Sequence, residues 1–397
     1  MKKIKILRII NRFNLGGPTY NAAYLTKYMP EEYETLLIGG IPEKHETDSL
    51  HIVKSLGIEP ILIPEMSRSI SIYNDFKAYF HIRKYIQHFQ PDIVHTHASK
   101  AGLLGRLAAI HTNVRIIVHT FHGHIFHSYF HPFLTEIFLH TERYLAKRTS
   151  KLIAISPLQK QELTEYFRVA DDKKFVMIPL GLDLQKFSEE KQSKRLLFRK
   201  MHNLPETLVV IAIVGRLAPV KNHTLILDAI KLLKKKSEKK FELLIIGDGE
   251  LKNELINYAQ QLGLQYRTHA NQAPADVYFT SWIKEMDKAY AGTDIVALCS
   301  KNEGTPVSLL EAQASAKFIV STNVGGVKDI VHPNSGIIVP DFSAETLANA
   351  LNTAIDQFEV QNQNIEKYIS PSIIQQYSYH TLVQNMDKLY KKLLGKE

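Results

Sequence analysis

The chain alternates short apolar runs with longer stretches in which apolar residues recur every three or four positions. The short runs are rich in Val, Ile and Leu and lack strict polar alternation, which is typical of parallel strands that are buried on both faces. In the first half of the chain the runs lie at 3–10, 34–40, 92–97, 115–123, 151–156 and 174–181. In the second half they lie at 208–216, 241–249, 276–282, 294–300, 318–326 and 335–340. We therefore expect the same α/β arrangement to occur twice.

Helical patterns such as 75–89 and 222–236 separate the predicted strands. This alternation predicts an α/β fold with two Rossmann-like domains that face each other across a cleft and bind ligands at the carboxyl ends of their strands. The stretch 183–207 is polar, charged and poor in strand patterns, so we expect it to be the interdomain linker. We predict one domain over 1–187 and a second over 205–378, and an amphipathic helix at 379–394 that packs back on the first domain.

The composition is that of an ordinary water-exposed globular protein, with 45% apolar and 22% charged residues among 397. No stretch reaches about 18 consecutive apolar residues, so no membrane-spanning helix is expected. Arg8 and Asn11 interrupt the apolar run near the start, which disfavours a signal peptide. The single cysteine, Cys299, lies in a predicted buried strand and is expected to be a core thiol. These features together predict a cytoplasmic protein.

The net charge of +9 suits an anionic partner, such as a nucleotide, a phospholipid surface or a nucleic acid. The densest basic run, 231–240, is expected to be the solvated end of a helix, where cations suit the helix dipole. The sequence has no zinc-ligand spacing, no aromatic RNA-binding signature and no low-complexity tail. We therefore expect no nucleic-acid partner.

A glycine turn follows the first predicted strand. Gly16 and Gly17 allow a ligand to approach the backbone closely, and Pro18 suits a helix start. The turn does not match the GxGxxG fingerprint, and the expected ribose-binding acid about 20 residues later is missing, so NAD binding is disfavoured. Two interpretations stay open, a donor-binding turn and a turn that serves tight packing alone.

Two cations follow the first strand of the second half, in "VGRLAPVKN". Arg216 and Lys221 are predicted to lie between the strand end and a helix N-terminus, where positive charge opposes the helix dipole. An anion such as a diphosphate would remove this conflict. We therefore predict that both residues bind phosphate groups.

The segment "SKNEGTPVSLLEAQASAK" places one carboxylate in a loop and another about two helical turns further on. Glu303 is expected to reach a sugar, while Glu311 lies in an otherwise apolar helix and needs a polar partner, such as ribose hydroxyls. The first backbone amides of this helix are free to bind phosphate oxygens. The predicted donor-binding residues of the segment are Glu303, Gly304, Thr305, Val307, Ser308 and Glu311.

Histidines are concentrated in the first half, at His95, His97, His119, His122, His124, His127 and His131. No Asp or Glu accompanies the cluster and no HxxxH pair lies on a clear helix, so we expect no metal site. Most of these residues are expected to be core or strand-end histidines. His122 differs because it ends a predicted strand beside Gly123, where a ligand site is expected.

Taken together, the motifs resemble family-four retaining glycosyltransferases of the GT-B fold. The resemblance covers nearly the whole chain in matching order. It is carried by the glycine turn, 91–109, "HTFHGH" at 119–124, "IPLGLD" at 178–183, "VGRLAPVKN", and the spaced glutamates in "EGTPVSLLEA". The Arg–Lys pair together with the glutamates is the specific part. The "GTP" triplet replaces the aromatic residue and second glycine of many relatives, which leaves the donor sugar open.

The resemblance implies a role for each matching residue. Arg216 and Lys221 would hold the diphosphate of a sugar nucleotide, Glu303 would contact the transferred sugar, and Glu311 the ribose. The backbone near Trp282 would contact the base. The catalytic set would be His122, Glu303, Arg216 and Lys221, with Gly16 and Gly17 among the donor-binding residues.

The predicted activity is retaining transfer of a hexose from a nucleotide-diphosphate donor, most simply a UDP-sugar, to an acceptor hydroxyl without a metal cofactor. Cell-surface polysaccharide or glycolipid assembly on a lipid-linked saccharide is the expected setting. The segment 125–148 is either an amphipathic core helix or a patch for the inner face of the cytoplasmic membrane. Alternatives left open are a sugar-nucleotide epimerase of the same fold, a non-catalytic nucleotide-binding subunit and a dehydrogenase.

Overall fold

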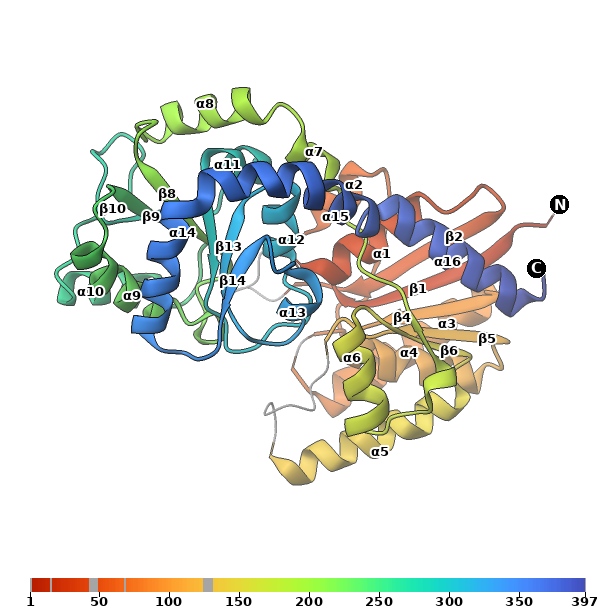
Figure 1. Ribbon diagram of the computed structural model, residues 1–397. Helices are drawn as coiled ribbons and strands as arrows, with labels where there is room; N and C mark the ends of the chain where they lie inside the picture. The colour runs from red at the N-terminus through yellow and green to blue at the C-terminus, as the bar shows by residue number, and fades with distance from the viewer. Residues whose placement is uncertain (1, 15, 43–48, 68, 124–130, 397) are drawn as a thin grey trace. The chain divides into compact units, whose positions relative to one another are not determined.

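The computed structural model describes residues 2–14, 16–42, 49–67, 69–123 and 131–396. It divides the chain into two compact units, unit 1 (Met1–Leu182 with Tyr377–Glu397) and unit 2 (Asp183–Gln376). Each unit contains a parallel seven-stranded sheet with helices on both faces (Figure 1). The prediction of two Rossmann-like α/β domains is confirmed.

The sheet of unit 1 has the strand order β3-β2-β1-β4-β5-β6-β7. The central strands β4 and β5 are buried along their whole length, as their continuous apolar runs predict. The strands are β1 (Ile4–Arg12), β2 (Tyr33–Gly40), β3 (Ile61–Leu62), β4 (Ile93–His97), β5 (Ile116–Thr120), β6 (Lys151–Ala154) and β7 (Phe175–Met177). The helices are α1 (Gly17–Lys27), α2 (Leu50–Ser55), α3 (Ile72–Phe89), α4 (Ser99–His111), α5 (Pro132–Arg148), α6 (Pro157–Gln161), η1 (Glu162–Tyr166), η2 (Asp172–Lys174) and α16 (Tyr379–Leu394).

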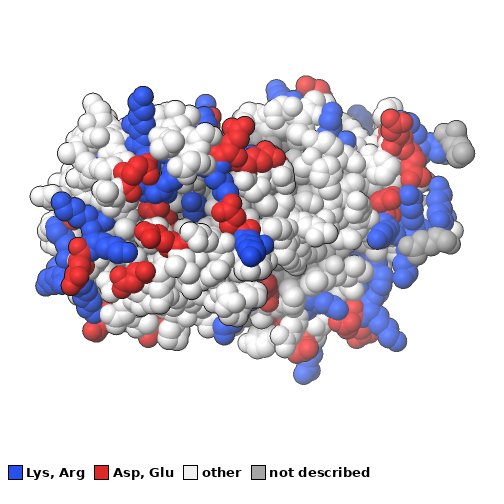
Figure 2. Space-filling model, turned by 45° about the horizontal axis from the view of Figure 1, so that its top comes forward, with Lys and Arg blue, Asp and Glu red and all other residues white. Residues whose placement is uncertain are grey.

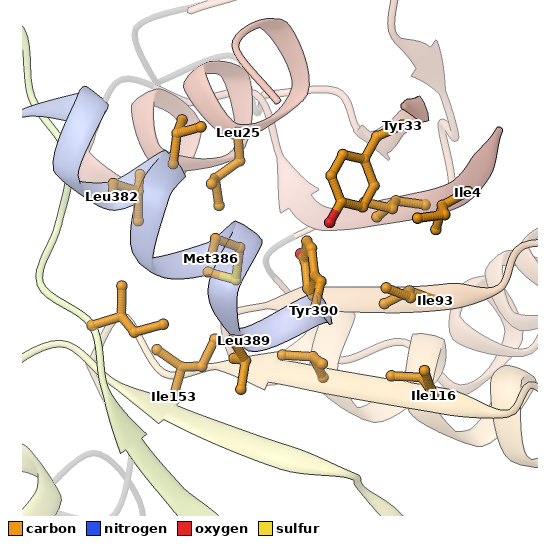
Figure 3. Packing of buried hydrophobic residues seen from close by; sticks show 14 residues of the cluster. Ile4, Leu25, Tyr33, Ile93, Ile116, Ile153, Leu382, Met386, Leu389 and Tyr390 are labelled. Atoms are coloured by element: carbon orange, nitrogen blue, oxygen red, sulfur yellow. The ribbon is translucent and has the colours of Figure 1, made fainter. Parts of the chain in front are cut away.

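The last helix, α16, forms part of the core of unit 1. Leu382, Met386, Leu389 and Tyr390 recur at helical spacing and face strand residues that include Ile93 (Figure 3). The chain enters α16 through backbone hydrogen bonds to Leu182, which accepts from the amide of Tyr379 at 3.1 Å. The helix is therefore integral to the unit that begins the chain.

The sheet of unit 2 has the order β10-β11-β9-β8-β12-β13-β14, and β8, β12 and β13 are buried throughout. The strands are β8 (Val209–Val214), β9 (Phe241–Ile246), β10 (Tyr266–Arg267), β11 (Val277–Ser281), β12 (Ile295–Leu298), β13 (Phe318–Thr322) and β14 (Gly336–Val339). The helices are α7 (Gln185–Ser188), α8 (Lys191–Met201), η3 (Pro219–Lys221), α9 (His223–Lys236), α10 (Lys252–Gln261), α11 (Met286–Gly292), α12 (Val307–Ala314), α13 (Val327–Ile330), α14 (Ala344–Asn364), η4 (Ile365–Ile369) and α15 (Ser370–Gln376).

The linker prediction for 183–207 is wrong. This segment folds as α7 and α8 within unit 2, and the division of the chain falls after Leu182. Arg199 of α8 is buried and donates to Asp294 at 2.6 Å, so a charged side chain anchors the helix to the strand side of the unit. The segment's high charge therefore reflects buried ion pairing as well as solvent exposure.

Two short strands of the structure were not predicted from the sequence. The strands β3 and β10 have two residues each and lie at sheet edges, so neither contains a run long enough to show a period.

Within the described residues, no helix combines the length and apolarity needed to cross a bilayer. Basic and acidic side chains are interspersed on the face seen in Figure 2, so the net charge is not gathered there into one patch.

The strand orders fix where a ligand site is expected. In each sheet the chain first adds strands on one side and then crosses back to the other side of its first strand. This switch lies between β1 and β4 in unit 1 and between β8 and β12 in unit 2. Loops diverge at the carboxyl ends of the two strands at such a point, which leaves room for a ligand.

Candidate functional site

The switch point of unit 2 brings together two residues that the sequence places far apart. Lys221 ends the turn η3 after β8, and Glu303 lies in the loop after β12. Their side chains form an ion pair with 2.6 Å between Nζ and Oε1. The same two loops are joined by a backbone hydrogen bond of 2.8 Å from the amide of Lys301 to the carbonyl oxygen of Val220. The pairing of Lys221 with Glu303 therefore spans the switch point.

The Glu303 carboxylate is held through one oxygen only. Ser300 Oγ donates to Oε1 at 2.6 Å, and Lys221 Nζ contacts the same atom. Among the described residues, no donor reaches Oε2. The carboxylate is thus fixed in orientation and keeps one oxygen that can accept a ligand hydroxyl.

The backbone of Glu303 is fixed by a glycine pair after β13. Gly325 has a positive φ of 48°, and a methyl group on it would lie 1.7 Å from the Glu303 carbonyl oxygen. The amide of Gly326 donates to the Gly304 carbonyl oxygen at 2.9 Å. Only glycine permits this approach, so the β13–α13 loop acts as a support for the loop that contains Glu303.

Arg216, at the end of β8, lies beside the loop that follows β9. Its guanidinium contacts Glu250, with 3.0 Å between Nη2 and Oε2, and both side chains are largely exposed. A methyl group on Gly247 would lie 1.9 Å from the Gly215 carbonyl oxygen, so glycine lets the two loops pack closely. An exposed pair of this kind contributes little to stability, and Arg216 can exchange its partner for an anionic ligand.

The anion that the sequence analysis invoked beside these cations is supplied in part by the protein itself. Each pairs with a carboxylate, Arg216 with Glu250 and Lys221 with Glu303. The carboxylates come from neighbouring loops that only the sheet order brings close. The charge conflict at the helix start is thus relieved within unit 2 before any ligand binds.

The second glutamate, Glu311, lies in α12 as predicted. Burial raises the pKa of its carboxyl from 4.5 to about 7, while a hydrogen bond from Tyr290 acts in the opposite direction. The single proton of the Tyr290 hydroxyl is shared between Glu311 and the carbonyl oxygen of Ser308, which lies 3.0 Å away, and this tyrosine is buried. Tyr290 therefore ties Glu311 to the first turn of α12, where the amides of Val307 and Ser308 begin the helix.

Thr305 and Trp282 complete the set predicted in unit 2. Thr305 is 9% exposed, and its Oγ1 is buried without a hydrogen-bond partner among the described residues. Such a group is expected to find a partner in a ligand or water. Trp282 follows β11 and is 39% exposed. It therefore lies at the same end of the sheet as the β8 and β12 loops, two strands from β8.

The switch point of unit 1 contains the remaining predicted residues. Gly16 and Gly17 begin α1 directly after β1, and Pro18 occupies the first turn, as the sequence predicts. His97 ends β4, and its Nδ1 lies 3.0 Å from Nε2 of His122 in the turn after β5. His122 is therefore within hydrogen-bond distance of the buried His97.

The buried histidines make separate hydrogen bonds: His95 with Tyr390 and Thr120, His119 with Thr96, and His97 with His122. Burial lowers the pKa values of His95, His97 and His119 well below 6.5, and that of His122 to about 3, so all four rings are neutral. Within the described ranges, no group of three or more His, Cys, Asp or Glu side chains is arranged to hold a metal ion. His124 and His127 lie outside the described residues, as does part of the segment 125–148.

Several residues of these sites were not found by sequence reasoning: Ser300, Glu250, Tyr290, Gly325 and Gly326. The glycine pair in "NVGG", directly after a buried strand, is a signal that could have pointed to a close backbone approach. The roles of Glu250 and Tyr290 depend on contacts between separate loops and helices. No local pattern in the sequence reports those contacts.

Comparison with known proteins gives matches in both units. The model of "Glycosyl transferases group 1" matches residues 194–369, and that of "Glycosyltransferase Family 4" matches residues 16–186. The Escherichia coli UDP-Gal:alpha-D-GlcNAc-diphosphoundecaprenol alpha-1,3-galactosyltransferase is 30% identical over 302 residues, which cover 75% of each chain.

Solved structures share the whole fold. Anabaena Alr3699/HepE in complex with UDP has a TM-score of 0.78 and 18% identity, covering 98% of this chain and 100% of the other. WaaG, a glycosyltransferase involved in lipopolysaccharide biosynthesis, has a TM-score of 0.71 and 16% identity, covering 96% and 98%. Because both family models and the 30% identical relative match the chain, and because it forms two parallel sheets, it belongs to glycosyltransferase family 4 and is a glycosyltransferase of the GT-B fold.

Proposed function

We propose that this enzyme transfers a hexose, with retention of anomeric configuration, from a UDP-sugar to a hydroxyl of a lipid-linked saccharide. The similarity to a galactosyltransferase named for UDP-Gal and a diphosphoundecaprenol-linked GlcNAc supports both substrate classes. The similarity in fold to a protein solved with UDP is consistent with a uridine donor. Polysaccharide or glycolipid assembly is the proposed setting.

The ion pair between Lys221 and Glu303 is the observation on which the proposal chiefly rests. The side chains are 25% and 12% exposed, so the pair is held at the protein surface, where a ligand can reach it. A diphosphate would attract the Lys221 ammonium more strongly than a single carboxylate does, because it carries more negative charge. The Glu303 carboxylate would then accept hydrogen bonds from the transferred sugar.

The chemistry assigned to these residues is stabilisation of the leaving group. The bond between the anomeric carbon and the diphosphate oxygen breaks, and the negative charge that develops is met by Arg216, Lys221 and the amides that begin α12. The acceptor hydroxyl attacks on the same face, its oxygen forms the new glycosidic bond, and a phosphate oxygen takes its proton. These groups supply the positive charge without a metal, which we propose the enzyme does not need.

The remaining roles are those that the family resemblance implies. Glu311 would accept hydrogen bonds from the ribose, and the backbone near Trp282 would contact the base. His122, Gly16 and Gly17 would contribute from unit 1, with His122 near the sugar. Gly304, Thr305, Val307 and Ser308 would line the donor phosphates, and the unpartnered Thr305 hydroxyl is a ready donor to a phosphate oxygen.

The proposal is tested by Lys221→Ala and Glu303→Ala, with Lys301→Ala as the matched control. Lys301 is an exposed lysine of the same loop whose backbone, rather than its side chain, makes the contact to Val220. Transfer of labelled sugar from UDP-hexoses to a diphosphoundecaprenol-linked GlcNAc should fall by about 10²- to 10³-fold in the two variants and little in the control. Near-normal transfer in both variants would refute the site assignment.

The same assay separates the alternatives. Isomerisation of the donor sugar without any acceptor would identify an epimerase instead. Binding of UDP without release of sugar to any acceptor would identify a non-catalytic subunit. A screen of nucleotide sugars by thermal stabilisation would fix the base and the sugar together, because a ligand that binds the folded state raises its unfolding temperature.

We also propose that unit 1 contacts the membrane surface, on the cytoplasmic side, where a lipid-linked acceptor would be presented. Large side chains on the outer face of α3 are exposed to solvent by 44% to 89%, namely Ile72, Tyr73, Phe76 and Phe80. Such a patch is unusual for a surface helix and is typical of interfacial binding. On α5, Phe133 is 73% exposed, while Lys147 and Arg148 follow in the last turn.

The charge of α3 favours an anionic lipid surface as the partner. Its one acidic residue, Asp75, is paired with Lys100, whereas Lys77 and Lys84 are exposed. Ile72→Ser/Phe76→Ser should reduce sedimentation with vesicles that contain anionic lipid, and Tyr166→Ser, which changes another exposed aromatic residue of unit 1, should not. Equal sedimentation of all three proteins would contradict the contact.

A further inference from the structure

A buried network leads from the C-terminal helix to the switch point of unit 1. The Tyr390 hydroxyl lies 2.7 Å from His95 Nδ1, and the other ring nitrogen of His95 lies 2.8 Å from Thr120 Oγ1. The His95 and His97 rings have centroids 4.1 Å apart, and His97 contacts His122. The links join α16 to β4, β4 to β5, two residues of β4 to each other, and β4 to the turn after β5, so the contacts run from the helix toward the carboxyl ends of these strands.

Arg8 determines the direction of these hydrogen bonds. This arginine is fully buried, and its Nη1 lies 2.9 Å from the Tyr390 hydroxyl and 3.1 Å from His95 Nδ1. A guanidinium can only donate, so His95 Nδ1 must be an unprotonated acceptor. The Tyr390 hydroxyl accepts from Arg8 and directs its own proton at the same Nδ1 atom, whose single lone pair the two donors share. His95 consequently carries its proton on Nε2 and donates it to Thr120.

The buried charge of Arg8 has no carboxylate partner among the described residues. Its acceptors are the carbonyl oxygen of Leu25, the Tyr390 hydroxyl and His95. Burying a cation among neutral acceptors is costly, and an apolar side chain would fill a strand interior at lower cost. The arrangement is therefore better explained by the state it imposes on the histidines than by stability alone.

We propose that Tyr390 is a positioning residue for the sugar-transfer site. It holds the ring of His95, which packs against the His97 ring, and His97 in turn contacts His122 with 3.0 Å between ring nitrogens. This inference rests on the proposed role of His122. It assigns to α16 a second task besides filling the core, because the helix supplies the hydroxyl that ends the network.

Tyr33 provides a matched control in the same packing cluster. Its hydroxyl donates to Asp387 of α16 at 2.7 Å, and its ring lies 6.1 Å from that of Tyr390 (Figure 3). Both hydroxyls make contacts between α16 and the rest of unit 1, Tyr33 with Asp387 and Tyr390 with Arg8 and His95. Only the Tyr390 hydroxyl has a described contact with a histidine.

The experiment compares Tyr390→Phe and Tyr33→Phe in the full-length protein. Both variants keep the ring, so their unfolding midpoints should fall by similar amounts. Tyr390→Phe should lower kcat about tenfold with little change in KM for the donor, whereas Tyr33→Phe should leave kcat within about twofold. In a His122→Ala background, Tyr390→Phe should have no further effect on kcat, because positioning residues act through their target.

Nitrogen-15 NMR of the imidazole rings tests the network without relying on activity. The wild-type His95 should show the Nε2-protonated tautomer, and the His97 and His122 signals should shift in Tyr390→Phe but not in Tyr33→Phe. Equal losses of kcat in the two variants, or additive losses with His122→Ala, would overturn the inference. If the wild type transferred no sugar, the proposed function would fail, while the ring signals would still decide whether the network exists.

Discussion

Glu303 and Glu311 lie eight positions apart in one segment, yet their surroundings differ. Glu303 contacts Lys221 and Ser300, whereas Glu311 lies within α12 and contacts Tyr290. Different surroundings allow two carboxylates to serve different tasks near neutral pH. The contrast supports a sugar contact for Glu303 and a ribose contact for Glu311.

Donor binding should depend on pH through Glu311. Burial raises its pKa to about 7, so the carboxylate that accepts ribose hydroxyls is formed mainly above that pH. The Kd for a UDP-hexose, measured by calorimetry, should therefore fall about tenfold between pH 6 and pH 8. In Glu311→Gln this dependence should disappear. A wild-type Kd that stays constant over the range would contradict the ribose contact.

The same shift affects stability with the opposite trend. A carboxyl whose pKa is higher in the folded state than in the unfolded state binds extra protons on folding, so it favours the folded state at low pH. Relative to Glu311→Gln, the wild type should lose unfolding free energy as the pH rises from 4.5 to about 7. Urea denaturation of both proteins at several pH values measures the difference. Parallel curves would show that Glu311 titrates normally.

At the scale of single residues, the sequence predicted which charged residues lie at the switch point, but not which residues they pair with. Lys221 and Glu303 were each identified from their own loops. Their mutual contact follows from β12 lying next to β8, which is a property of strand order. Tyr290 and Glu250 were missed for the same reason, because a partner across two loops leaves no local pattern.

At the scale of elements, the β13–α13 loop shows how one loop can fix another. Gly325 and Gly326 lie against the backbone of Glu303 and Gly304, so the position of the loop that contains Glu303 depends on a neighbouring strand end. Long buried strands and amphipathic helices were predictable because their periods are clear. The two-residue edge strands were not predictable because they are too short to show a period. The helix α8 was not predictable because its charged residues conceal its buried side.

Gly325→Ala should impair transfer although the glycine side chain contacts nothing. The new methyl group would lie 1.7 Å from the Glu303 carbonyl oxygen and must displace that loop. Gly263→Ala is the control, because Gly263 also has a positive φ, of 74°, but has open space around it. Both variants carry backbone strain of about 1 kcal/mol. A kcat loss confined to Gly325→Ala is expected, and similar kcat values in both would argue against the support role.

At the scale of the whole molecule, two sheets of the same kind are built from one chain, but unit 1 is discontinuous in sequence. Leu382, Met386, Leu389 and Tyr390 of α16 are buried in its core. The amphipathic pattern of 379–394 allowed the helix to be predicted. The unit boundary could not be read as accurately, because α7 and α8 are as polar as a linker.

A chain that ends at Gln376 should keep unit 2 and lose unit 1. Removing α16 would expose the strand residues that it covers and would leave Arg8 without the Tyr390 hydroxyl. Hydrogen exchange should therefore show rapid exchange in β1, β4 and β5, with protection retained in β8 and β12. Wild-type protection of β4 in the truncated protein would show that α16 is dispensable for the core.

The return of α16 also bears on how the protein is made. A ribosome releases the strands of unit 1 first, but the residues that close their core emerge last. All of unit 2 is synthesised before α16, so unit 2 can fold while the apolar face of unit 1 that α16 covers is still exposed. A chaperone would therefore be needed most while unit 1 still lacks α16.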